Sequence, residues 1–181
     1  AGVQKPILVL GFINTSLQDI VDCNLDMIIS DVATMHDLNA VGKKNNKKIN
    51  VHLKIDTGLS RLGIFPSEFK MFMDELDLMS HLKLQGICSH LIEACNPESV
   101  HAQEEILKPF YQPGLQFHTS NSHGSLVTKN KYSFVRIGAG LYGYLPEADE
   151  KLQNLLHPIL SLKTKVIAVK TIPAGATVGY A

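Results

Sequence analysis

Polar and charged residues follow four apolar stretches of this sequence, each at the point where the stretch ends. They are Lys54-Ile55-Asp56-Thr57-Gly58-Leu59-Ser60-Arg61, Ser89-His90, His118-Thr119-Ser120-Asn121-Ser122 and Arg136-Ile137-Gly138-Ala139-Gly140. If the stretches are parallel strands of a barrel, their carboxyl ends meet at one rim, where barrels gather functional groups. Taken singly, Asp56, Ser120 and Asn121 could equally fill turns or cap helices. Their combination predicts a functional site at this rim.

Two of these segments suit an anion such as phosphate. Asn121-Ser122 stands just before a predicted helix and offers a hydroxyl and free N–H groups. Gly138 and Ala139 offer backbone amides that an anion can approach closely. The chain contains no G-x-x-x-x-G-K-[ST] motif, so a nucleotide-binding P-loop is not supported.

The histidines raise the alternative of a metal site. His52, His90, His101, His118 and His123 are scattered, without H-E-x-x-H or a similar local spacing. We therefore expect no metal, and we expect structural hydrogen bonds from the histidines near the rim.

Short apolar runs alternate with stretches of helical periodicity along the chain, and both sets can be given as ranges. The predicted strands are Ile7–Phe12, Asp26–Ser30, Ile49–Asp56, Leu84–His90, Gln116–Ser120 and Phe134–Leu141. The predicted helices are Leu17–Val21, Ala33–Asn45, Pro66–Met79, Pro97–Phe110 and Ser122–Thr128. This alternation predicts an α/β fold with βα units and a parallel sheet.

Strand counting leaves two architectures open. An open doubly wound sheet tolerates six strands, whereas a closed (β/α)8 TIM-type barrel needs eight. If the fold is a barrel, about six of its eight βα units are present, and we expect the other two to precede Ala1.

The pattern changes after Pro146. His157–Lys170 is rich in Leu, Val and Ile with interspersed lysines, and Pro173-Ala174-Gly175 is a turn signal before Thr177–Tyr180. We expect two antiparallel strands here, at the start of a separate β domain. The predicted domains are residues 1–146, the C-terminal part of a barrel, and residues 147–181, a linker and the first strands of the β domain.

The composition excludes several kinds of partner. The 17 basic and 17 acidic residues balance, which favours neither nucleic acid nor a membrane surface. No apolar run approaches the roughly 20 residues of a membrane span. Three cysteines without a C-x-x-C spacing fit a reducing cytoplasm.

Five motifs resemble the alanine racemase family, in family order and over almost the whole chain. His52 to Gly63 resembles its H-x-K-x-D-T-G-M-x-R-x-G stretch, and Gly86 to His90 resembles its G-x-x-S-H. His118 to Ser122 is similar to H-x-A-N-S, Val135 to Gly143 to R-P-G-x-x-L-Y-G, and Leu160 to Tyr180 to the opening of the family's C-terminal β domain. The departures, such as Leu59 for Met and Ile137 for Pro, remove no group with a named role.

The resemblance implies a pyridoxal 5'-phosphate site in a homodimer. It implies that Arg136 donates to the cofactor's pyridine nitrogen and that His90 holds Arg136 in place. Arg61 would lie near the cofactor's phenolic oxygen and the substrate carboxylate. The implied cofactor-binding residues around the phosphate are Asn121, Ser122, Gly138 and Ala139. Lys54 matches a family lysine that is often carbamylated and that supports the arginine.

The resemblance also implies a reaction, the interconversion of L- and D-alanine by two-base proton exchange at Cα, with D-alanine supplied for peptidoglycan. Tyr180 would be one catalytic base, facing the cofactor of the partner subunit. The other base would be the lysine that carries the cofactor as a Schiff base. No lysine of this chain has that context, so we expect it in the βα units before Ala1.

Three alternatives remain at this point. The protein could be a serine or broad-specificity amino-acid racemase. It could be another enzyme of this barrel class, such as a decarboxylase or D-amino-acid aldolase, although a cation at Arg136 is a poor match for a reaction that needs a strong electron sink. It could also be a non-catalytic pyridoxal-phosphate-binding barrel protein, but such proteins lack the predicted β domain.

Overall fold

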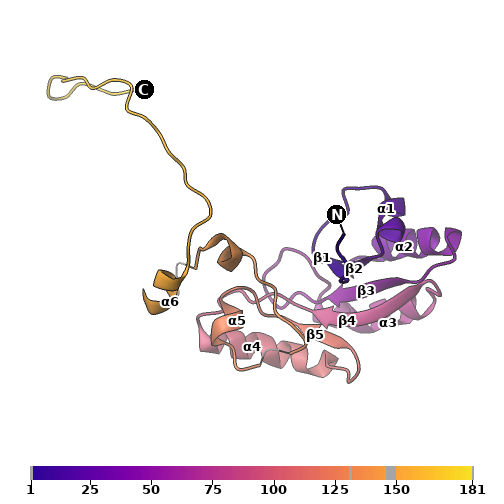
Figure 1. The fold of residues 1–181 in the computed structure, drawn as a ribbon. Coiled ribbons are helices and arrows are strands. Elements are labelled where there is room, and N and C mark those ends of the chain that lie inside the picture. Colours follow the sequence, from indigo (N-terminus) through magenta and orange to yellow (C-terminus); the bar gives the residue numbers. More distant parts are fainter. Residues whose placement is uncertain (1, 131, 146–149, 181) are drawn as a thin grey trace.

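A computed structural model describes residues 2–130, 132–145 and 150–180 (Figure 1). Its strands are β1 (Ile7–Val9), β2 (Leu25–Ile29), β3 (Ile49–Lys54), β4 (Leu82–Cys88) and β5 (Gln116–His118). Its α-helices are α1 (Leu17–Asp22), α2 (Val32–Lys44), α3 (Phe69–Asp77), α4 (Pro97–Leu107), α5 (Gly124–Val127) and α6 (Glu150–Leu155). Short 3-10 helices are η1 (Pro66–Glu68), η2 (Lys108–Phe110) and η3 (Ala139–Tyr142).

The strands form one parallel sheet in the order β1-β2-β3-β4-β5, curled into part of a barrel (Figure 1). This confirms the predicted α/β class and the alternation of strands with helices. Each neighbouring pair of strands is consecutive in the sequence, as the βα units of a TIM-type barrel require. The parallel arrangement brings all five carboxyl ends to one rim.

The core lies between this sheet and the helices that cover it. Leu53 of β3 and Ile87 of β4 pack with Ile20 of α1, Leu38 of α2 and Phe72 of α3 in one buried cluster. Strand β3 is buried along almost its whole length, because a parallel strand in an α/β fold is covered on both faces. Polar side chains at the carboxyl ends of these strands are therefore held by a rigid scaffold.

The helix α4 begins with two sequence signals. Asn96 precedes it, and the Asn96 Oδ1 atom accepts hydrogen bonds from the N–H groups of Glu98 and Ser99. Pro97 occupies the first helical position, where its missing N–H group costs nothing. Both signals fix the start of the helix, which was predicted at the same residue.

The predicted sixth strand, Phe134–Leu141, does not form. Its first part runs beside β5 in parallel, because Ser133 N donates to Phe117 O and Arg136 N donates to Ser120 O. The pairing ends there, since the side chain of Ser122 takes the N–H groups of Gly138 and Gly140 that a continuing ladder would need. The chain then turns into η3 instead of extending.

The predicted strand pair near the C-terminus is also absent, since the described residues 156–180 contain no strand. The turn at Pro173 is present, with Ala176 N donating to Pro173 O. Leu162, Ile167 and Val169 are 99%, 96% and 93% exposed. A two-stranded ribbon without a layer over its apolar face is marginal in water, which accounts for the irregular chain.

The helix α6 lies within the segment predicted as a linker. The predicted domain boundary after Pro146 lies outside the described residues. The division into residues 1–146 and 147–181 therefore stays a prediction. Among the described helices, none has the length and apolar character needed to cross a membrane.

Candidate functional site

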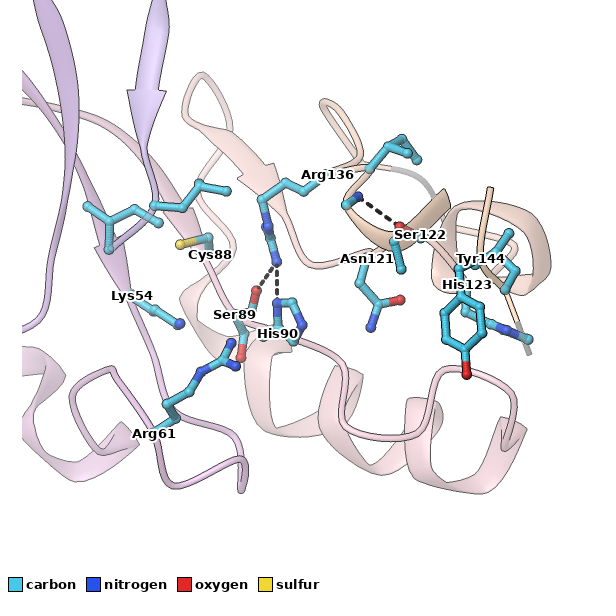
Figure 2. A pocket seen from close by; sticks show the side chains of 16 residues that line it. Lys54, Arg61, Cys88, Ser89, His90, Asn121, Ser122, His123, Arg136 and Tyr144 are labelled. Atoms are coloured by element: carbon cyan, nitrogen blue, oxygen red, sulfur yellow. Dashed lines mark hydrogen bonds between the residues drawn. The ribbon is translucent and has the colours of Figure 1, made fainter. Parts of the chain in front are cut away.

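A cavity of about 520 Å³ opens at the carboxyl ends of the strands (Figure 2). This volume is within the range of small-molecule sites. It is lined by Leu10, Ile28, Lys54, Arg61, Cys88, Ser89, His90, Asn121, Ser122, His123, Arg136, Ile137, Gly138, Ala139, Tyr144 and Leu145. Every predicted site residue is in this set except Tyr180, which is fully exposed.

Arg136 lies at the centre of the cavity wall with its guanidinium among neutral acceptors. One terminal nitrogen donates to the ring and to the carbonyl oxygen of His118, the latter at 3.0 Å. The other donates to the carbonyl oxygens of Ser89 at 2.6 Å and Thr119 at 3.0 Å. The Nε atom has no hydrogen-bond partner among the described residues. Arg136 therefore keeps one donor for a ligand, and no carboxylate of the described residues forms an ion pair with it.

His90 contacts Arg136, as predicted from the sequence. Its Nδ1 atom lies 3.3 Å from a terminal nitrogen of Arg136 (Figure 2). Burial, reinforced by the charges of Arg136, Arg61 and Lys54, lowers the pKa of His90 to about 4. Near neutral pH His90 is thus an uncharged acceptor that orients the guanidinium.

Two further histidines extend this arrangement into the core; structural hydrogen bonds were expected of the rim histidines, but the pairing of His118 with His52 was not predicted. The His118 ring accepts from Arg136 at Nδ1, and its Nε2 atom lies 3.0 Å from Nδ1 of His52. A guanidinium cannot accept a hydrogen bond, so the proton of neutral His118 is on Nε2 and points to His52. Burial and the charge of Arg136 lower the pKa of His118 to about 2. Burial also lowers the pKa of His52.

Lys54 and Cys88 are buried neighbours on the cavity floor. Burial lowers the pKa of the Lys54 ammonium, the nearby charges of Arg61 and Arg136 act in the same direction, and Cys88 opposes them. Burial raises the pKa of the Cys88 thiol to about 11, against the effect of Arg136 and Lys54. The floor thus pairs a lysine whose charged form is disfavoured with a protonated thiol.

Arg61 is presented by a closed turn after β3. Ile64 N donates to Lys54 O and Asp56 N donates to Ile64 O, which closes the base of the turn. Inside it, the Asp56 carboxylate accepts from the N–H groups of Gly58 at 2.8 Å and Ser60 at 3.1 Å. Asp56 is therefore a turn-forming residue, one of the two alternatives that the sequence left open.

Ser122 joins the segment after β5 to the segment that carries Arg136. Its Oγ atom accepts from Gly138 N at 2.8 Å and Gly140 N at 3.2 Å. The Ser122 hydroxyl proton and the Ala139 N–H group, which has no acceptor among the described residues, remain available for an anion. The predicted amide of Gly138, by contrast, is already bonded to Ser122.

Asn121 lines the cavity, but its polar atoms also serve the local fold. Its Oδ1 atom accepts from Gly124 N at 2.9 Å, and its Nδ2 atom donates to Leu91 O at 3.3 Å. It thus ties the segment after β5 to the segment after β4. Its role toward a ligand stays a prediction.

A second set of residues supports the cavity from behind, and one of them, Gln103, was not predicted from the sequence. Gln103 of α4 is buried, and its Nε2 atom donates to Thr57 Oγ1 at 2.6 Å and to the carbonyl oxygen of His90 at 3.1 Å. Thr57 Oγ1 lies 2.9 Å from Ser89 Oγ. A signal was present, because Gln103 shares the buried face of the helix with Val100 and Leu107.

Comparison of the sequence with known proteins finds alanine racemases. The family model described as alanine racemase, N-terminal domain, matches residues 1–146. An alanine racemase of Methylacidiphilum infernorum (isolate V4) is 35% identical over 99% of this chain and 47% of its own length. This chain spans about half the length of the curated relatives it matches.

Solved structures agree with the sequence comparison. Alanine racemase of Clostridium difficile 630, including a complex with cycloserine, superposes with a TM-score of 0.71 and 27% identity over 87% of this chain, covering 44% and 47% of the two solved chains. A Bartonella henselae alanine racemase with covalently bound pyridoxal phosphate has a TM-score of 0.63 at 22% identity, over 79% of this chain and 43% of that one. The latter likeness shows the fold alone.

Proposed function

Because this chain belongs to the alanine racemase family, as its match over residues 1–146 shows, we propose that the whole protein carrying it interconverts L- and D-alanine with pyridoxal phosphate. The whole protein exchanges the Cα proton through two bases, one on each face of the substrate. The observation that carries this proposal is the environment of Arg136, a cation held only by neutral acceptors at the centre of the cavity.

The charges of the cavity fit the cofactor, which bears a phosphate and a phenolate. Lys54, Arg61 and Arg136 line the cavity, and no carboxylate does so among the described residues. Ser122 and Ala139 offer a hydroxyl and an amide on the same wall. We propose that these two groups bind the phosphate, that Gly138 and Asn121 shape this wall, and that Arg61 lies toward the substrate carboxylate.

The cofactor supplies an electron sink for the charge left at Cα when its proton is removed. Arg136 sets the strength of that sink. Its unused Nε donor would meet the pyridine nitrogen, and a permanent cation there keeps that nitrogen unprotonated. A weaker sink restrains transamination and still permits proton exchange. His90 keeps the guanidinium in this orientation.

The two bases come from outside this cavity. Tyr180 is fully exposed, and we propose that it serves the cavity of the partner subunit in a homodimer. The second base is the lysine that carries the cofactor, in the remainder of the whole protein. We further propose that Lys54, buried between cations, supports Arg61, as a carbamate or as an amine.

Other substrates and other reactions of this enzyme class can be weighed on the same residues. Serine differs from alanine by one hydroxyl, so a serine or broad-specificity racemase is the second candidate. A decarboxylase or aldolase is disfavoured by the cation at Arg136. We also propose a cytoplasmic location and a role in D-alanine supply for peptidoglycan, as the resemblance to the family implies.

Proton exchange tests the proposal directly. The whole protein with pyridoxal phosphate is incubated in D₂O with L-alanine, L-serine or L-glutamate in separate samples. We expect deuterium at Cα and formation of the D-isomer for L-alanine first, and neither without the cofactor. Absence of deuterium from every amino acid would reject the racemase function.

A further inference from the structure

We infer that Gln103 is a positioning residue for the cavity, which holds His90 and Ser89 against Arg136 from the helix behind them. Gln103 lines no part of the cavity, so its effect on a ligand passes through other residues. The inference concerns how the central cation of the proposed function is oriented, and to that extent it rests on that function.

The side chain of Gln103 is fully engaged although it is buried. Only 3% of the residue is exposed. Its Nε2 atom donates to Thr57 Oγ1 at 2.6 Å and to His90 O at 3.1 Å. Its Oε1 atom accepts from Ile92 N at 2.9 Å. Leaving such buried polar groups without partners is costly, so the amide holds one geometry.

The segment that Gln103 holds is otherwise tied down by a few hydrogen bonds, among them those from Ser89 N to His118 O and from Asn121 Nδ2 to Leu91 O. Residues 89–93 form no helix or strand, so their backbone path depends on side-chain contacts. Gln103 bonds the chain on both sides of Leu91, at His90 O and Ile92 N. The contact that this path fixes is His90 Nδ1 with Arg136, at 3.3 Å.

A second connection runs from Gln103 through Thr57. Thr57 Oγ1 lies 2.9 Å from Ser89 Oγ, and both residues are buried. The carbonyl oxygen of the same Ser89 accepts the 2.6 Å hydrogen bond from Arg136. Gln103 thus restrains two of the residues that orient the guanidinium, through two separate sets of hydrogen bonds.

The test measures the His90–Arg136 contact in the whole protein without cofactor, so it does not depend on turnover. Gln103→Met keeps the length of the side chain and removes its polar atoms. We expect the His90 pKa, followed by NMR of its Cε1–H, to rise from about 4 toward the ordinary value of about 6.5, because His90 moves away from Arg136 and into water. An unchanged titration of His90 would overturn the inference.

Asn39 provides a matched control. It is also an amide on a helix, and its Oδ1 atom accepts from His81 N at 3.0 Å, remote from the cavity. Asn39→Leu should lower the free energy of unfolding without moving the His90 titration. Equal shifts in both variants would show general loosening and contradict a positioning role for Gln103.

Thr57→Val is the second variant, and it replaces the first if Gln103→Met does not fold. It removes the Gln103–Thr57–Ser89 connection and leaves the bond to His90 O. We expect a smaller rise of the His90 pKa, and no rise would also overturn the inference. If the His90 pKa rises in these variants as expected but the unaltered whole protein shows no racemase activity, the proposed function is rejected and the positioning role of Gln103 stands.

Discussion

The guanidinium of Arg136 donates a hydrogen bond to the ring of His118, a buried residue 18 positions earlier in the chain. This contact makes the imidazole an acceptor at Nδ1 and a donor at Nε2, toward His52. The cation of the cavity is therefore anchored in the core of the sheet through the rings of His118 and His52.

Arg136→Glu should slow racemisation by the whole protein and raise the share of transamination. The change removes the cation proposed to keep the cofactor's pyridine nitrogen unprotonated, and loss of such electrostatic control costs on the order of 10²-fold in kcat. The measurement is the ratio of D-alanine to pyruvate formed from L-alanine.

Arg136→Lys is the control for this change. It also loses the forked contacts to Ser89 O and Thr119 O, so both variants should lose stability, but it retains a positive charge. We expect its product ratio to stay near that of the unaltered protein. If Arg136→Glu leaves the ratio where it was, the role assigned to the cation is wrong.

Tyr180→Phe should lower turnover in both directions, since racemisation needs a proton acceptor on one face of Cα and a donor on the other. Positioned acid or base groups contribute roughly 10²–10⁴-fold, and a loss of this size is expected in initial rates with L- and D-alanine. Tyr111→Phe, which changes a tyrosine outside the cavity, should leave both rates unaltered. Normal rates in Tyr180→Phe would remove this residue from the mechanism.

Ser122→Ala should weaken binding of pyridoxal phosphate. The variant loses the proposed hydroxyl donor to the phosphate and leaves Gly138 N and Gly140 N without their acceptor. A cost of about 1–3 kcal/mol corresponds to roughly a 5- to 150-fold higher Kd, measurable by equilibrium dialysis.

Ser133→Ala is the matched control for Ser122→Ala, because the Ser133 hydroxyl also accepts a backbone N–H, that of Phe117, but outside the cavity. It should alter stability and leave the Kd for the cofactor unchanged. Equal Kd values for the two variants would contradict the phosphate-binding role of Ser122.

The protein should lose stability as the pH falls below about 6.5, because of His90 and His118. Their folded-state pKa values are lowered to about 4 and about 2, whereas an unfolded histidine titrates near 6.5. Between these limits the unfolded chain binds protons that the folded chain does not, so the free energy of unfolding falls with falling pH, by at most about 1.4 kcal/mol per pH unit and group.

Urea titrations between pH 7 and pH 4 measure this dependence. His118→Gln should flatten it, although the variant is less stable at pH 7 because it loses the contact to Arg136. His101→Gln changes an exposed histidine and controls for the mere removal of one imidazole. The same slope in all three proteins would argue against a neutral His118.

Gly86→Ala should destabilise the sheet. A Cβ atom at Gly86 of β4 would lie 2.5 Å from Nδ1 of His52 and 2.6 Å from the carbonyl oxygen of Gln116. Such overpacking costs about 1–3 kcal/mol and would displace the ring that His118 bonds. Gly11→Ala, where a Cβ meets nothing within 4 Å, is the control, and equal unfolding midpoints for the two would contradict this account.

Much of the fold could be predicted from local patterns. The first five strands and their helices were expected because continuous apolar runs, such as Ile7-Leu8-Val9, and caps, such as Asn96-Pro97, act over a few residues. The sixth strand was predicted wrongly for a non-local reason. Phe134–Leu141 has strand-like residues, but a serine hydroxyl 16 positions before Gly138 takes the amide that a strand would use.

The candidate site also has a part that local patterns predicted and a part that they did not. Arg136, His90, Arg61 and Ser122 were predicted to share one rim, because each follows an apolar strand, and the structure brings them to one cavity. The contacts of His118 with His52 and of Gln103 with Thr57 span 66 and 46 residues. No local pattern encodes the pairing of two buried polar groups so far apart, so these contacts could be found only in the folded chain.

The neutral histidines around Arg136 take no part in proton transfer near neutral pH. Imidazole is commonly recruited as a proton shuttle near neutrality, yet His90 and His118 are held far below that range. They neither store nor release protons under physiological conditions, and the charge presented by Arg136 stays constant while they surround it. A bell-shaped rate profile near neutrality would then report groups other than His90 and His118, so these two rings act through charge and geometry and not through proton transfer.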